Sequence, residues 1–252
     1  MDRNAKTIAA LLLRTLRVAA VAFALVFGLA FLLQLVTREE SAANYVIHPA
    51  LILAVWICVR FLDRMAFREL GLSPAPKAPG HFLFGAGLAV ISTILMGLGM
   101  VLTGEIDPAK HEFLQTEPSK IPGTLLYCIV IGFAEELLFR GYLIALWRQY
   151  GRLYAGIVVS ALLFSAAHVL NPSYGPAAFV AALAIGLLYG YMVLATGTLW
   201  MPIGHHIAWN FCQMLFLPQV GGEIAASVIV AASFMVLFAY FHRTKAEKIM
   251  VK

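Results

Sequence analysis

The 252-residue chain is 62% hydrophobic and only 12% charged, and its mean hydropathy is +0.86. Soluble domains carry roughly 25% charged residues, so this composition excludes an ordinary water-soluble fold. The net charge of +5 does not indicate a nucleic-acid partner, because the basic residues are scattered over the expected loops and termini without forming a stripe. The sequence therefore predicts an integral, multi-pass membrane protein in contact with the lipid bilayer.

Long apolar runs joined by short polar segments predict about eight transmembrane helices, because about 20 apolar residues are needed to cross the hydrocarbon layer. We expect the spans at residues 18–36, 45–61, 81–102, 121–147, 153–170, 176–195, 199–217 and 224–241. The first run is too long for the apolar segment of a signal peptide, so we expect a retained helix. The predicted fold class is all-α, a polytopic membrane helical bundle that forms a single membrane domain over residues 1–252.

Basic residues gather at one end of the predicted bundle. Eight spans place both termini on the same side, and nearly all lysines and arginines fall there, whereas Arg38, Lys110 and Lys120 lie opposite. The positive-inside rule therefore predicts that both termini are cytoplasmic, at the inner membrane if the protein is bacterial.

Three weaker patterns lie within or between the spans. Residues 63–80 combine arginines with apolar residues before three prolines, which predicts a short interfacial helix and a stiff linker. Residues 103–120 form the longest outer loop, and we favour a solvated connector over a lid. Gly186 and Gly190 form a Gly-x-x-x-Gly pattern, which predicts close helix packing within the chain or between copies.

The fourth predicted span carries three charged residues, Glu135, Glu136 and Arg140, in an otherwise apolar run. Inserting such a charge costs about 2.5 to 3.5 kcal/mol, so these residues usually face a bundle interior and have a function. Glu136 and Arg140 share one helical face, which predicts an ion pair between them. Glu135 points about 100° away, so it is the carboxylate that we expect to be free for chemistry.

The fifth and seventh spans carry imidazoles and an amide. Phe164 and His168 share a helical face, and so do His206 and Asn210. Each helix can therefore present its polar group to a common centre. His205 faces elsewhere, and we expect it to be a buried histidine bonded to a backbone carbonyl.

A free glutamate, two histidines and an amide supply what the activation of water needs: a general base, an orienting imidazole and donors for an oxyanion. Hydrogen bonding between helices is the structural alternative, but it rarely needs two adjacent glutamates. A transporter also places carboxylates and histidines within its spans. However, the chain shows no second copy of these motifs, as internal repeats would require. We therefore predict a hydrolytic site within the bilayer.

Three motifs follow each other on separate spans: two adjacent glutamates with an arginine four residues after the second, then Phe-x-x-x-His, then His-x-x-x-Asn. In this order they resemble the CPBP family of intramembrane proteases, which includes the CAAX prenyl endopeptidases of the Rce1 type and the bacterial Abi proteins. The resemblance covers residues 121–217, which we expect to form the catalytic core. It implies an intramembrane endopeptidase.

The resemblance also implies a role for each polar residue of the motifs. Glu135 and His168 would activate the attacking water. His206 and Asn210 would stabilise the oxyanion of the peptide being cleaved. The supporting residues would be Glu136 and Arg140.

The family has also been described as metalloprotease-like, which makes Glu135, His168 and His206 alternative ligands for a zinc ion. The chain has no His-Glu-x-x-His zincin helix, and Asn210 is a better oxyanion donor than zinc ligand. We therefore favour activation of water without a metal. The implied substrate is a membrane-associated or lipid-modified protein, as in CAAX processing. The alternative function is a non-proteolytic, Abi-like role in bacteriocin immunity or as a membrane partner.

Overall fold

The computed structural model describes residues 3–38, 42–73, 76–112, 114–169 and 174–218, together with 222, 229, 230, 232, 233 and 237–239. Within these residues the regular structure is helical and contains no strand. The α-helices are α1 (Arg3–Thr37), α2 (Ala42–Ile57), α3 (Ala78–Leu102), α4 (Ile121–Glu136), α5 (Ile144–Gln149), α6 (Leu153–Ala167), α7 (Pro176–Thr196) and α8 (Trp200–Phe216). The shorter elements are the π-helices η1 (Cys58–Leu62) and η4 (Leu137–Leu143) and the 3-10 helices η2 (Phe67–Leu70) and η3 (Pro118–Lys120).

Four helical stretches in the described part of the chain are long and apolar enough to cross a membrane: Thr7–Thr37, Ala78–Leu102, Pro118–Gln149 and Pro176–Thr196. The helices around α2 and α6 are apolar but shorter. Helix α8 has only 17 residues, and most of its first half is buried against other helices and not exposed to lipid. The chain is an integral membrane protein.

The predicted all-α membrane bundle is confirmed. Every predicted span up to residue 217 coincides with helices, and α4, η4 and α5 together form the fourth. The predicted eighth span, residues 224–241, lies largely outside the described residues.

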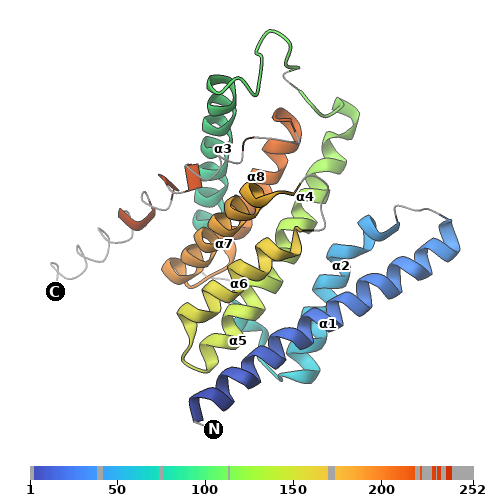
Figure 1. Ribbon diagram of the computed structural model, residues 1–252, viewed down its shortest axis with the longest axis vertical. Coiled ribbons are helices and arrows are strands. Elements are labelled where there is room, and N and C mark those ends of the chain that lie inside the picture. Colours follow the sequence, from blue (N-terminus) through green and yellow to red (C-terminus); the bar gives the residue numbers. More distant parts are fainter. Residues whose placement is uncertain are drawn as a thin grey trace.

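Helices α1 and α2 form a hairpin, and the end at which α1 connects to α2 points away from α4 (Figure 1). Helices α3, α4 and α8 lie side by side, and α6 packs on α7. The N-terminus and the α5–α6 connection lie at one end of the bundle, whereas the α3–α4 loop lies at the other. The predicted topology likewise places the N-terminus and the connection between the fourth and fifth spans at one end and residues 103–120 at the other.

The basic end of the bundle is organised by one buried carboxylate. Asp63 accepts from Arg17 Nη2 at 2.5 Å and from the Tyr142 hydroxyl at 2.6 Å, and its side chain is 1% exposed. Arg14 Nη1 lies 3.4 Å from the same carboxylate. These contacts anchor the part of α1 that precedes the predicted span at residue 18 to the rest of the chain. They also fix the α1–α2 hairpin against η4.

The predicted interfacial helix in residues 63–80 is only the single turn η2. Its Glu69 carboxylate accepts from the Ala66 backbone N–H at 3.0 Å and from Gln149 Nε2 at 2.6 Å. The backbone hydrogen bond, followed by the side-chain bond, lowers the pKa of Glu69. This turn is therefore attached to the end of α5.

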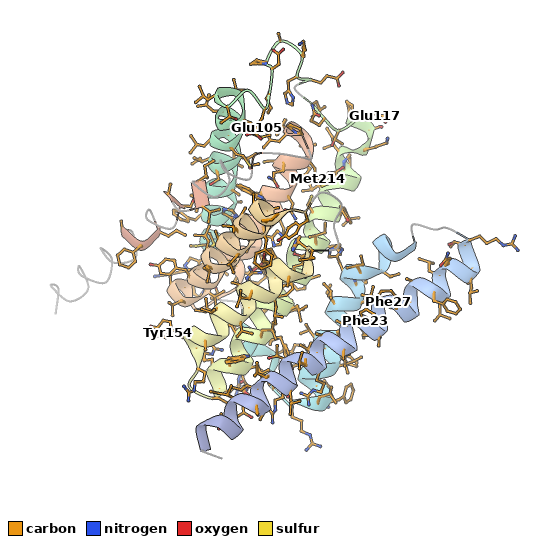
Figure 2. All side chains as sticks on the ribbon, in the orientation of Figure 1. Phe23, Phe27, Glu105, Glu117, Tyr154 and Met214 are labelled. Carbon is orange, nitrogen blue, oxygen red and sulfur yellow. The ribbon has the colours of Figure 1, made fainter. Side chains whose placement is uncertain are left out.

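The outer loop, residues 103–120, caps α8. The Gln115 backbone N–H donates to the Leu215 carbonyl at 2.7 Å, and the Thr116 hydroxyl donates to the Met214 carbonyl at 2.8 Å. Such carbonyls in the last turn of a helix have no partner within it. Figure 2 shows Met214 at the same end of the molecule as the loop. The loop therefore serves as the C-terminal cap of α8.

The Gly-x-x-x-Gly pattern lies against α6 within the chain. A Cβ on Gly186 would meet Ala161 Cα at 3.0 Å, and one on Gly190 would meet Ile157 Cγ2 at 2.5 Å. Of the two predicted settings, the structure shows close packing within the chain.

Two further glycines hold α3 and α8 together. A Cβ on Gly85 would collide with the Met201 carbonyl oxygen, and a Cβ on Gly204 would collide with the Phe82 carbonyl oxygen. A backbone carbonyl cannot move aside as the end of a flexible side chain can. The two helices therefore approach closely only because both positions lack a side chain.

We expect Gly85→Ala to destabilise the protein by about 1 to 3 kcal/mol, the usual cost of overpacking a core. Gly87→Ala is the matched control, since nothing lies within 4 Å of a Cβ at that position on the same helix. Unfolding of both purified variants in detergent measures the difference. Equal stability of the two variants would contradict this account of the α3–α8 contact.

Candidate active site

A cavity of about 820 Å³ lies between helices α1, α2, α4, α6, α7 and α8. Its walls are mainly apolar, and they include small residues of α1 and α6. Four of the predicted site residues lie on its wall: Glu135, His168, His206 and Asn210. The structure thus brings together residues that the sequence places on three separate spans.

Glu136 lies buried behind the cavity wall and joins two helices. Its Oε1 accepts from Arg140 Nη1 at 3.1 Å, which is the ion pair predicted from their spacing, and from His206 Nδ1 at 2.9 Å. Neither the glutamate nor the arginine side chain is exposed. The guanidinium also lies 4.2 Å from the centre of the Phe164 ring and 5.0 Å from that of Tyr189. The carboxylate therefore fixes the position of His206 as well as balancing the arginine charge.

The chain leaves α-helical geometry directly after the two glutamates. In helix η4, a π-helix, each backbone hydrogen bond spans five residues instead of the four of an α-helix, a local change often found at functional sites. The Phe139 carbonyl in this segment accepts from the Ser160 hydroxyl of α6 at 2.7 Å. The altered turn is thus held by a neighbouring helix.

Glu135 lies between two histidines. Its Oε1 is 3.5 Å from Nε2 of His48 on α2, and its Oε2 is 3.8 Å from Nε2 of His206. Oε2 has no hydrogen-bond partner within the described part of the chain, although it is buried. Glu136 Oε2 also lacks a partner, but Glu135 lines the cavity and Glu136 does not. As expected from the sequence, Glu135 is therefore the carboxylate that can face a ligand.

His48 is a residue of the cavity wall that the sequence analysis missed. The signal was present, because a histidine inside an apolar span is by default a functional candidate. Tyr189 of α7 was missed too, since a single tyrosine in an apolar helix carries no such signal. Its ring lies beside Arg140, and its hydroxyl bonds His205.

The hydrogen bonds of the two histidines define the same tautomer, with a proton on Nδ1 of each ring. His168 Nδ1 lies 2.8 Å from the Phe164 carbonyl, which can only accept, so Nδ1 carries the proton and neutral His168 has its lone pair on Nε2. His206 Nδ1 likewise donates to the Glu136 carboxylate. A second proton, on His206 Nε2, requires the imidazolium form, whose charge then lies beside two carboxylates.

The remaining predicted residues differ in environment. Asn210 lies on the cavity wall, and its side-chain amide has no hydrogen bond to the described residues. His205 is buried and away from the cavity, as expected, but Nδ1 lies 3.0 Å from the Tyr189 hydroxyl and not from a backbone carbonyl. Its ring stacks on Trp209 at 5.8 Å. The adjacent histidines therefore face different surroundings.

The three alternative zinc ligands do not fit around one ion. Within the ranges that the structure describes, no group of three or more His, Cys, Asp or Glu side chains is arranged to hold a metal. The arrangement gives no support to the description as a metalloprotease.

The family model described as "Type II CAAX prenyl endopeptidase Rce1-like" matches residues 117–212. This segment is Rce1-like. The resemblance to the CPBP family is therefore confirmed over these residues, which contain all three motifs. Over these residues the chain is similar to the CAAX prenyl endopeptidases of the Rce1 type.

A second comparison extends beyond the Rce1-like segment. The chain is 26% identical over 188 residues to "Uncharacterized protein YyaK" of Bacillus subtilis (strain 168). The aligned region covers 70% of this chain and 60% of that protein. The chain thus spans less than two thirds of the relative's length.

Proposed function

We propose that this chain is an intramembrane endopeptidase that cleaves a peptide bond of a membrane-associated or lipid-modified protein, as in CAAX processing. The observation that carries the proposal is the buried, unpartnered Oε2 of Glu135 on the wall of a largely apolar cavity. Such a carboxylate oxygen can accept a proton from water. The Rce1-like family match supports the same reaction class.

In the proposed reaction, water is the nucleophile. Glu135 Oε2 takes a proton from it while the lone pair on His168 Nε2 accepts a hydrogen bond that orients it. The water oxygen bonds to the peptide carbonyl carbon, and the carbonyl oxygen becomes an oxyanion. When the C–N bond breaks, the proton held by Glu135 passes to the leaving amine.

The oxyanion needs hydrogen-bond donors placed in advance. The side-chain amide of Asn210 supplies one donor without titrating. His206 supplies the other from Nε2 in its imidazolium form. The pair formed by Glu136 and Arg140 holds His206 through its Nδ1, so these residues act through the histidine.

The proposed reaction uses only groups of the chain. Activity after chelation, together with metal analysis of the purified protein, tests for a zinc requirement.

We place both termini in the cytoplasm, at the inner membrane in a bacterium, because the end that carries Arg14, Arg17, Arg148 and Arg152 is the basic one.

Comparison of protein C-termini in membranes that contain the chain or its Glu135→Gln variant tests this function. We expect C-termini that appear only with the unchanged chain, and these identify the substrates. Identical C-termini in both membranes, with normal biological activity of the variant, would favour a non-proteolytic, Abi-like role. Proton or solute flux in liposomes without new termini would indicate a transporter.

A further inference from the structure

His48 is the one imidazole of the cavity wall that stands outside the Rce1-like segment, residues 117–212. It lies on α2, its side chain is 10% exposed, and its Nε2 is 3.5 Å from Glu135 Oε1. The edge of its ring meets the Tyr127 ring of α4 at 5.9 Å and 86°. The position of His48 is therefore set by the helix that carries the glutamate.

The two oxygens of Glu135 have unequal surroundings. Oε1 lies 3.5 Å from His48 Nε2, whereas Oε2 lies 3.8 Å from His206 Nε2 and has no hydrogen-bond partner among the described residues. A carboxylate held at one oxygen keeps one rotamer and presents the other oxygen in a fixed direction. A free glutamate in a cavity of about 820 Å³ would instead sample several rotamers, and misplacement by about 1 Å can cost a reaction about 100-fold.

The α1–α2 hairpin is itself held in place. Arg17 of α1 and Tyr142 of η4 both donate to Asp63, which follows η1. One end of the hairpin is thus joined to the helix that continues from the two glutamates. His48 therefore approaches Glu135 from a supported element.

We propose that His48 is a positioning residue for Glu135, so that the N-terminal hairpin completes the catalytic site. This inference rests on the proposed function for its kinetic consequence. His48 donates from Nε2 to Oε1 and directs Oε2 at the water. The groups around the pair are Tyr127 of α4, His206 of α8 and His168, which follows α6.

The kinetic test compares His48→Leu with His48→Gln. The probe is an internally quenched peptide with a prenylated cysteine followed by three residues, given to the purified chain in detergent. We expect His48→Leu to lower kcat by about 10- to 100-fold at unchanged KM, because only the orientation of the base is lost. Glutamine keeps an N–H donor, so His48→Gln should recover kcat to within a few-fold of the unchanged chain.

His81→Gln is the matched control, since this histidine of α3 bonds Thr198 and does not line the cavity. It should leave kcat unchanged. Full kcat in His48→Leu would overturn the inference, and so would an equal loss in the leucine and glutamine variants.

A double-mutant cycle tests the contact without cleavage. His48→Leu, Glu135→Leu and the double variant are compared by Tm in detergent, because leucine at either position removes the contact. We expect the Tm loss in the double variant to be smaller than the sum of the two single losses. Additive losses would overturn the inference even if the peptide is cleaved. Coupled losses with no cleavage by the unchanged chain would instead reject the proposed function and retain the contact.

Discussion

Glu135→Gln is expected to lower the rate of peptide cleavage by about 10²- to 10⁴-fold, the usual contribution of a general base, while Tm in detergent changes little. Glutamine has the shape of glutamate but cannot take a proton from water. Its amide oxygen can still face His48, and its side chain remains on the cavity wall. Initial rates and Tm of the purified variant measure both effects.

Glu136→Gln is the control, because it makes the same chemical change one residue away. It should lower Tm as well as the rate, since the buried Arg140 loses its counterion and His206 loses a charged acceptor. If Glu135→Gln cleaved as fast as the unchanged chain, Glu135 would not be the base. If both variants lost Tm equally, the division between a catalytic and a supporting glutamate would be wrong.

The sequence predicts those features of the fold that depend on neighbours along the chain. Apolar run lengths gave the spans up to residue 217, because the hydrocarbon layer sets the number of residues required. The start of α1 was missed because Arg14 and Arg17 are balanced by Asp63, which is distant in sequence. The π-helix η4 was missed as well, since a shift of the backbone hydrogen bonds by one residue leaves no mark in composition.

In the candidate site, too, the sequence predicts only the contacts between residues that are neighbours along the chain. The pairing of Glu136 with Arg140 was predictable because both lie on one helix face. The bond from His206 to Glu136 was not, because helical spacing cannot show which residues of two helices meet. His48 lies on α2, outside the matched motifs, and its contact with Glu135 depends on how the hairpin packs.

Arg140→Met is expected to destabilise the protein by about 3 to 5 kcal/mol, the usual effect of removing one partner from a buried ion pair. Its side chain is fully buried, and its Nη2 also donates to the Gly186 carbonyl at 3.4 Å. Methionine fills similar space but leaves the Glu136 carboxylate without its positive partner. Denaturant unfolding in detergent, with cleavage measured on the same samples, gives both quantities.

Removing the Glu136 charge as well should restore stability without restoring activity. The double variant Arg140→Met with Glu136→Leu has no uncompensated charge, so it should regain part of the lost stability, since apolar replacements of buried ion pairs are often well tolerated. It should nevertheless stay inactive, because His206 Nδ1 then has no carboxylate to hold it. Recovery of cleavage together with stability would show that the ion pair supports folding alone and that His206 is oriented by other contacts.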